Sequence, residues 1–348
     1  VIGPPVLNLV EYSPTIEVLA KLGMFFLMFY AGLQTDLKEL TKMLKLFLSV
    51  GIGGTIAPLL LGMLVTILFG GNLNQAILIG LAISGTALAV KVKILTDLDF
   101  LKSRIGYIMM GASVTDNILS FIILAAVIKA LTVGFTPLDV GIAIIQVMLF
   151  FGIVLTIGYL VYPRIHRKIS GEMTVFGLTL ILGFLFAAIA EHIGIHFIIG
   201  AYLAGLLVRE ELEKGVFEKI DEMFSTLAYG FFAPIFIVSV SFHVTLGVFL
   251  TEVLFLIGLT LAAILGKLIG AGGGGYLTGL SREDAITVGI GMNARGMVEL
   301  ILAVVGLELG VLTDTHLTLL VAVAFITTFI TPAWLKHRLI TKKISESS

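Results

Sequence analysis

The chain has 348 residues, of which 58% are hydrophobic and 13% are charged, with a formal net charge of −1 at pH 7. Water-soluble domains carry about 25% charged residues, so this chain has too few charges to cover a water-facing surface, and most of its exterior is expected to face lipid. The near-neutral charge argues against nucleic acid as a partner, and the absence of cysteine excludes disulfides and thiolate metal sites.

Apolar runs long enough to span a membrane recur along the whole chain. A spanning helix needs about 20 mainly apolar residues, and the candidates are 16–35, 45–69, 74–95, 105–131, 138–162, 172–192, 194–208, 225–242, 246–273, 283–307 and 315–335. No long polar stretch divides them, so residues 1–348 are predicted to form one all-α polytopic membrane domain. The opening residues Val1–Pro5 read as the tail of an earlier helix, and we expect a segment to precede them.

Lysine and arginine occur in alternate loops between these segments. The basic positions are Lys38, Lys42 and Lys45; Lys102 and Arg104; Arg164, Arg167 and Lys168; Arg209, Lys214 and Lys219; Arg282; and Lys336 to Lys343. The other loops are nearly free of them, with Lys129 as the main exception. Because basic loops stay on the cytoplasmic side, we predict a multi-pass protein of the cell membrane (inner or plasma) with a cytoplasmic C-terminus.

Charged and strongly polar residues lie deep inside three of the predicted spans. They are Ser113, Asp116 and Asn117 in 105–131; Lys267 in 246–273; and Asn293, Arg295 and Glu299 in 283–307. A charge at the middle of a bilayer costs about 2.5–3.5 kcal/mol on insertion scales, so such residues mark ion pathways or internal pairs. These seven positions are therefore candidate ion-binding or supporting residues.

Two stretches of small and polar residues predict helices that are interrupted within the membrane. One is Ser84–Ala87 and the other is Gly289–Gly296. Irregular backbone at membrane depth is tolerated only where it lines a cavity or is covered by protein, and the ends of half-helices then present partial charges to an ion. The two stretches thus predict a transport site.

The interrupted segments occupy equivalent places in two triplets of spans. The first triplet runs through 45–131 and the second through 246–335, and each is interrupted in its middle member. Four spans separate the triplets, so the first member of one lies seven spans after the first member of the other. Because this offset is odd, the two first members enter the membrane from opposite sides. This is the arrangement of an inverted repeat.

Several ordered motifs resemble the monovalent cation:proton antiporter superfamily, particularly its bacterial and archaeal sodium–proton (NapA-like) and Kef-like branch. They are Leu22 to Leu33, Ile83 to Ala89, Gly200 to Leu206, Phe232 to Val240, Gly266-Lys267 and Ala294 to Glu299. The resemblance implies a homodimer in which an ion-carrying core, 45–131 and 246–335, slides against a scaffold that includes 16–35 and 138–242. It also implies that Thr86 belongs to the ion site and that Lys267 is the buried lysine of the family.

The resemblance departs from the family pattern at Asn117. Electrogenic members carry two adjacent carboxylates, and one alignment places Asn117 at the second, ion-binding one, with Asp116 as the partner of Lys267. A shift by one residue pairs Thr115 with Asp116 instead and makes Asp116 the ion-binding carboxylate. Both alignments stay open at this point.

Charge counting gives Asn117 a consequence. Burial favours the protonated form of a carboxylate and a nearby cation favours its charged form, so a proton and a metal ion compete for one site. If Asp116 pairs with Lys267, the pair is neutral, and Asn117 adds only a carbonyl oxygen. We therefore hypothesise that the cation binds weakly unless Lys267 loses its proton.

The predicted function is secondary active exchange of a monovalent cation, Na⁺ in first place, for H⁺ by elevator-type alternating access, with Na⁺ at Asp116. The alternatives are a K⁺/H⁺ exchanger and a transport-inactive, sensor-like or Asp-to-Asn variant. A passive channel is disfavoured because a Lys–Asp pair would obstruct a cation pore. No cofactor is expected. A membrane enzyme is not expected either, since no nucleophile–base pair or metal-binding spacing occurs at membrane depth.

Some of these features also have purely structural interpretations. Arg295 and Glu299 are four residues apart and would pair on one helix face, which would support the interrupted helix. The run Gly272–Gly275 lacks the Lys-Ser/Thr of a phosphate loop, and we expect a flexible cytoplasmic turn there.

Overall fold

The computed structural model describes residues 13–35, 43–133, 171–212 and 214–347, together with scattered positions between 141 and 160. Most of the predicted span 138–162 lies outside these residues, as do Val1–Pro5, Lys38, Lys42 and the basic positions from Arg164 to Lys168. Within the described ranges every regular element is a helix, and seven helices are long and apolar enough to cross a membrane. The predicted all-α, multi-pass architecture is confirmed.

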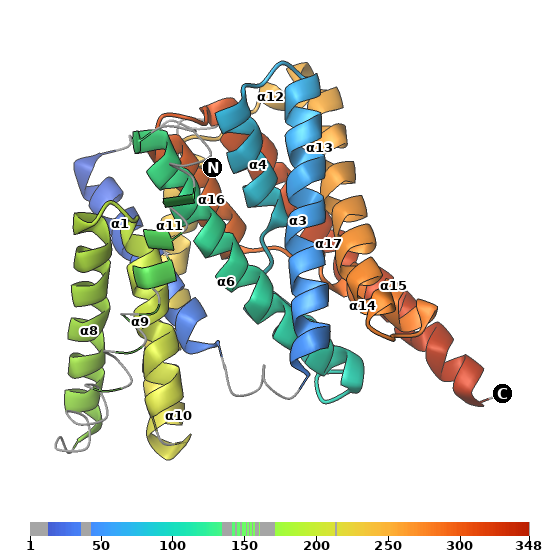
Figure 1. Cartoon of the computed structure of the whole chain (residues 1–348), viewed down its shortest axis with the longest axis horizontal. Coiled ribbons are helices and arrows are strands. Elements are labelled where there is room, and N and C mark those ends of the chain that lie inside the picture. The colour runs from blue at the N-terminus through green and yellow to red at the C-terminus, as the bar shows by residue number, and fades with distance from the viewer. Residues whose placement is uncertain are drawn as a thin grey trace. The chain divides into compact units, whose positions relative to one another are not determined.

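The helices follow the predicted spans closely (Figure 1). They are α1 (Pro14–Leu33), α3 (Leu44–Leu68), α4 (Leu73–Ser84), α5 (Leu88–Asp97), α6 (Arg104–Val133), α8 (Glu172–His192), α9 (Phe197–Glu211), α10 (Lys214–Ser225), η1 (Thr226–Phe232), α11 (Ala233–Ser241), α12 (Val248–Thr251), α13 (Val253–Lys267), η2 (Leu268–Gly272), α14 (Gly273–Leu277), α15 (Arg282–Gly291), α16 (Met297–Glu308) and α17 (Asp314–Ser347). The elements η1 and η2 are π-helical.

The chain divides into two compact units, each described here by itself. Unit 1 comprises residues 1–38 and 121–242, and unit 2 comprises residues 39–120 and 243–348. The assignment of 45–131 and 246–335 to a moving core, and of the other helices to a scaffold, stays a prediction.

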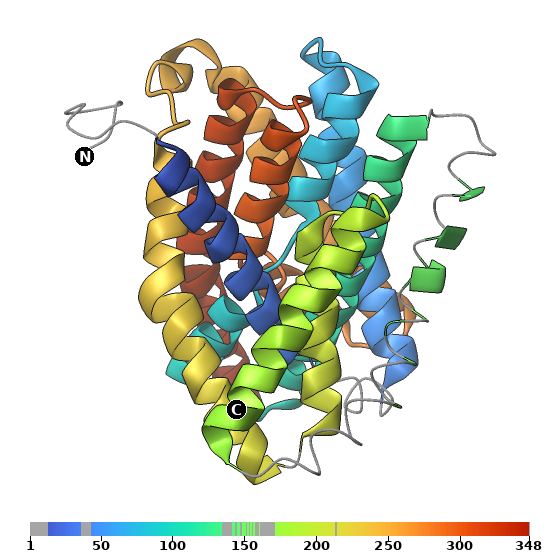
Figure 2. The ribbon, with the colours of Figure 1, turned by 90° about the vertical axis from the view of Figure 1, so that its left-hand side faces the viewer.

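Unit 1 is held together by close helix contacts and aromatic packing. The helix α1, drawn in dark blue in Figure 2, packs against α9 and α11. A Cβ on Gly205 of α9 would meet the carbonyl oxygen of Phe29 in α1, so glycine is what permits this approach, as in other membrane helix pairs. Phe26 stacks on Phe232 with ring centroids 4.4 Å apart.

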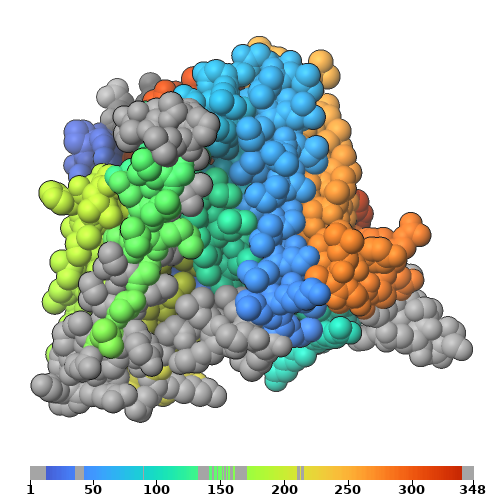
Figure 3. Space-filling view, viewed as in Figure 1, coloured from blue at the N-terminus to red at the C-terminus, as the bar shows by residue number. Residues whose placement is uncertain are grey.

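Unit 2 is built around α3, which packs against α4, α13, η2 and α14. Its other side carries exposed apolar residues at helical spacing: Leu44, Leu48, Ile52, Ile56, Leu60, Leu64, Ile67 and Leu68. Figure 3 shows this helix in blue, along the face turned to the viewer. An apolar stripe of this length on a membrane helix is suited to lipid.

The glycine run Gly272–Gly275 is helical and tightly packed, so the prediction of a flexible turn is wrong. Gly272 ends η2 and the next three glycines belong to α14. A Cβ on Gly274 would meet the backbone of Ser49 in α3, and the Ser49 hydroxyl donates to the Gly274 carbonyl at 2.9 Å. The glycines are needed for close helix packing and not for loop flexibility.

Both predicted interruptions are present, and both are shorter than the sequence stretches. In the first break, Gly85–Ala87, the chain runs extended between α4 and α5; in the second break, Met292–Gly296, it leaves the helix between α15 and α16. Figure 1 shows α4 ending beside the middle of α3. The predicted pattern of two interrupted helices, one in each triplet of unit 2, is confirmed.

Candidate functional site

The two breaks of unit 2 cross and are joined by a backbone hydrogen bond. The Ala87 N–H of the first break donates to the Ala294 carbonyl of the second at 3.0 Å. The Arg295 guanidinium donates to the carbonyl of Ile83 and to that of Gly85, the latter at 3.3 Å. These carbonyls belong to the end of α4, where the helix leaves them without internal partners, so Arg295 supplies the missing donors.

Asp116 of α6 lies at this crossing and accepts from three elements of unit 2. The Lys267 ammonium, at the end of α13, lies 3.2 Å from both carboxylate oxygens. The Thr55 hydroxyl of α3 donates to one oxygen at 2.5 Å, and the Thr86 hydroxyl of the first break donates to the other at 2.7 Å. The Asp116 and Lys267 side chains are both 0% exposed. This geometry provides a dehydrated carboxylate with two hydroxyl oxygens beside it, which suits a hard monovalent cation.

A second ion pair supports the crossing from α16. Arg295 Nη1 lies 3.6 Å from Glu299 Oε1, and both side chains are fully buried. Glu299 lies in the first turn of α16, where the helix dipole favours a negative charge. The third predicted supporting residue, Asn293, donates from its amide to the Gly289 carbonyl at 3.0 Å and, among the described residues, makes no hydrogen bond to either ion pair.

Ser113 of α6 is engaged by a residue that was not predicted. Lys91 of α5 is buried, and its ammonium lies 2.6 Å from the Ser113 hydroxyl oxygen and 3.1 Å from the Met292 sulfur in the second break. The Ser113 hydroxyl itself donates to the Met109 carbonyl at 2.6 Å. Lys91 thus connects α6 to the second break.

Asn117 is buried and follows Asp116 in sequence, but no hydrogen bond joins the two side chains. Its amide oxygen has no hydrogen-bond partner among the described residues. The Lys267 ammonium pairs with the Asp116 carboxylate. This pairing agrees with the alignment that makes Asp116 the partner of the lysine. An unpartnered buried amide oxygen is available to a ligand or to water.

Comparisons with known proteins identify the family of the chain. The sequence profile of the family described as "Sodium/hydrogen exchanger, transmembrane" matches residues 1–341. The chain belongs to the sodium/hydrogen exchanger family. It is therefore a cation/proton antiporter, a transporter and not an enzyme.

Its relatives cover nearly the whole chain. The Na⁺/H⁺-K⁺ antiporter GerN of Bacillus cereus is 35% identical over 340 residues, which span 97% of this chain and 87% of the relative. The Na⁺/H⁺ antiporter of Enterococcus hirae is 29% identical over 348 residues, spanning 99% of this chain and 89% of the relative. The solved sodium proton antiporter MjNhaP1 of Methanocaldococcus jannaschii has the same fold, with a TM-score of 0.76 at 16% identity, covering 97% of this chain and 89% of that one.

The structure places all eight predicted site residues in buried positions of unit 2. It brings Thr86 and Lys267 to Asp116, and Arg295 to Glu299, whereas Ser113 contacts Lys91 instead of Asp116. Sequence reasoning missed two residues. Lys91 lies inside the predicted span 74–95 and the rule that identified Lys267, a charge at membrane depth, would have found it; Thr55 is one of several small polar residues in its span and carries no such signal.

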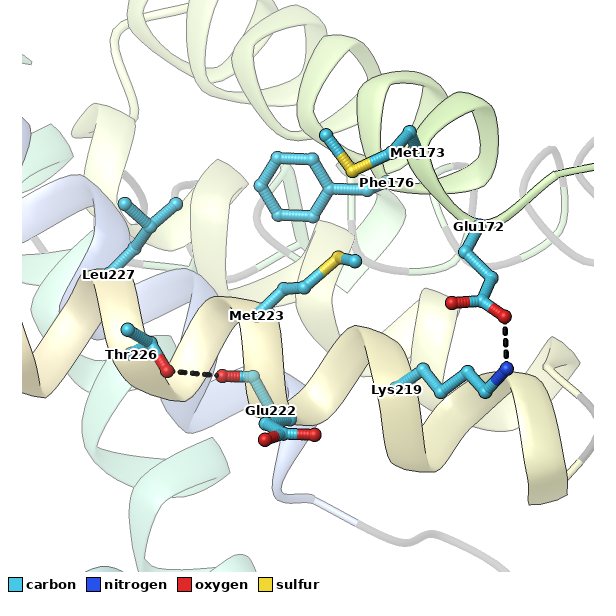
Figure 4. Close-up of a pocket in the computed structure, with 8 residues that line it drawn as sticks. All are labelled: Glu172, Met173, Phe176, Lys219, Glu222, Met223, Thr226 and Leu227. Carbon is cyan, nitrogen blue, oxygen red and sulfur yellow. Dashed lines mark hydrogen bonds and ion pairs between the residues drawn. The ribbon is translucent and has the colours of Figure 1, made fainter.

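A shallow groove of about 570 Å³ lies in unit 1, away in sequence from these residues. It runs between the start of α8 and the helix formed by α10 and η1, and an ion pair between Glu172 and Lys219 lies at one end (Figure 4). Its lining is mixed, with Met173, Phe176, Met223 and Leu227 beside the charged groups. None of the predicted site residues lines it.

Proposed function

We propose that the chain exchanges Na⁺ for protons and that Asp116 is the group at which they compete. The observation that carries this proposal is the environment of Asp116: a fully buried carboxylate, paired with Lys267 and flanked by two threonine hydroxyls, at the crossing of two interrupted helices. Burial opposes the bare carboxylate charge, so the group gains from binding either a proton or a cation, and one excludes the other. The names of GerN and of the Enterococcus hirae relative support Na⁺ as substrate, and that of GerN supports K⁺ as the second candidate.

We further propose that unit 2 carries the ion by an elevator movement and that unit 1 serves as the scaffold and homodimer surface. Unit 2 contains the site and both breaks, and among the described residues it holds every buried charged side chain. A carrier of this kind keeps its ion ligands together as it moves. The proposed setting is the cell membrane with the basic loops and the C-terminus in the cytoplasm, as the positive-inside rule predicts.

Proteoliposomes test the exchange directly. An imposed Na⁺, K⁺ or Li⁺ gradient should drive proton movement, which an internal pH dye records, and Asp116→Asn should abolish it. The matched control is Asp97→Asn, since Asp97 is an exposed acid on α5 that pairs with Lys93. Cation leak without proton movement would indicate a channel, and silence of the native chain would indicate a protein without transport.

The role of Asn117 has its own test. Because the Asp116–Lys267 pair is neutral, a second carboxylate in Asn117→Asp should strengthen cation binding and increase the number of protons released per cation in isothermal titration. If neither quantity changes, the hypothesis that missing negative charge limits binding is wrong.

A further inference from the structure

Lys91 is a buried lysine for which exchange at Asp116 gives no role. The described buried charged residues are Lys91, Asp116, Lys267, Arg295 and Glu299, so with every group ionised there are three positive charges and two negative ones. Asp116 pairs with Lys267, and Glu299 pairs with Arg295. Lys91 is the positive charge left without a carboxylate.

The described contacts of Lys91 are hydrogen bonds to neutral groups and not an ion pair. Among the described residues its ammonium has two bonded partners, the Ser113 hydroxyl and the Met292 thioether, and both are neutral. An ammonium offers three donors, and burying it against neutral groups alone disfavours its charged form. Lys91 is also the fourth residue of α5, near the positive end of the helix dipole, where a cation is disfavoured.

The position of the ammonium is what gives it a function. Ser113 precedes Asp116 by one helical turn, and Met292 opens the second break, so the Lys91 nitrogen lies against both the carboxylate helix and the interrupted helix. Among the described residues, the charged groups that influence it electrostatically are Asp116 of α6, Lys267 of α13 and Arg295 of the second break. A transported cation bound at Asp116 would add a second positive charge beside the Lys91 ammonium. Like charges repel strongly in such a low-dielectric site.

We propose that Lys91 is a tethered competitor of the transported cation and that it releases a proton when the cation binds. This inference rests on the proposed exchange at Asp116 and names a further residue of the same site. In the empty site the Lys91 ammonium donates a hydrogen bond to the Ser113 hydroxyl. On cation binding, one N–H bond of Lys91 breaks, its electron pair stays on nitrogen, and the proton passes to water, so the entering positive charge replaces the departing one.

Two substitutions of Lys91 should act in opposite directions. In Lys91→Met the competitor is permanently neutral, so each bound cation should release one proton fewer than in the native chain. Each proton released on binding makes the apparent Kd change by about tenfold per pH unit. The pH dependence of the apparent Kd should therefore be shallower in Lys91→Met by this one factor. In Lys91→Arg the charge cannot be lost, so cation affinity should fall by more than about tenfold at every pH.

The experiment is titration of the purified full chain with NaCl across a pH series, in buffers of different ionisation enthalpy that report proton release. Lys91→Gln provides a second neutral variant in case methionine disturbs packing. Lys93→Met is the matched control, since this lysine is two residues away on α5 and exposed. Thermal unfolding establishes that each variant is folded.

The outcomes separate this inference from the proposed function. Unchanged proton release and pH slope in both neutral variants, or native affinity in Lys91→Arg, would overturn the role of Lys91 while leaving exchange at Asp116 intact. Tighter cation binding in both neutral variants, with one proton fewer released per cation than in the native chain, supports the competitor role. Absence of binding in the native chain and in all variants defeats the proposed function and this inference together.

Discussion

The two units differ in what they bury. Every charged side chain that is buried among the described residues belongs to unit 2, whereas the buried polar residues of unit 1 are hydroxyl groups such as Thr35, Thr179 and Ser239. Unit 1 is packed instead by aromatic rings and by glycines between α1 and α9. Buried charge is expensive in a membrane, and its confinement to one unit among the described residues is why we propose that transport chemistry is located there.

This contrast is tested first by Arg295→Ala, for which we expect the largest effect. The substitution leaves Glu299 as an uncompensated buried charge and removes the donors to the Ile83 and Gly85 carbonyls. Removing one partner of a buried pair costs about 3–5 kcal/mol, so the unfolding midpoint in detergent should fall sharply and exchange should be lost. Arg282→Ala, an exposed arginine of α15, should change neither; equal behaviour of the two variants would refute the supporting role.

Phe26→Ala tests the other side of the contrast in unit 1. Phe26 is buried and stacks on Phe232. We expect a loss of stability at or below the low end of the roughly 3–5 kcal/mol seen in water-soluble cores, because lipid is itself an apolar reference state. The Na⁺ concentration for half-maximal exchange should stay unchanged. Ile181→Ala on α8, which is 66% exposed, serves as the control, and a marked change in Na⁺ dependence of Phe26→Ala would blur the division between the units.

Thr55→Val sharpens the comparison within unit 2 and should have the smallest effect on stability. It removes the 2.5 Å hydrogen bond to Asp116, and bonds to charged groups contribute about 1.5–3 kcal/mol. Without this donor the carboxylate charge is less stabilised, so protons compete better and the half-maximal Na⁺ concentration at neutral pH should rise about tenfold or more. The control is Thr66→Val in the same helix, whose buried hydroxyl donates to the Gly62 carbonyl; a similar rise in both would argue against a direct role for Thr55.

The spans and their interruptions could be predicted because each depends on local composition. The segment 172–192 coincides with α8, and the small, polar residues around Thr86 and Asn293 mark the two breaks. The glycine run at 272–275 shows the limit of this reasoning. Its composition suits either a turn or a tight helix contact, and the backbone of Ser49 on α3, a partner far away in sequence, decides for the contact.

All eight predicted residues of the candidate site are buried in unit 2, but their pairing was predicted only in part. Asp116 and Lys267 are an expected pair, but Ser113 was expected beside the ion and instead holds Lys91. Sequence separation carries no information about such contacts, because Ser113 is 22 positions from Lys91 along the chain and Met292 is 201 positions from it. Which polar atoms meet depends on how the helices turn about their axes.

Composition alone determined that this chain is a membrane protein, since it has too few charges to cover a water-facing surface. The same scarcity made each charge inside a span easy to identify. Membrane depth restricts the backbone to helices, so their number, order and interruptions follow from the residues. The tertiary structure decided which charges neutralise one another and which is left over. Pairing depends on distances of a few ångströms between helices remote in sequence, and only the packed helices set those distances.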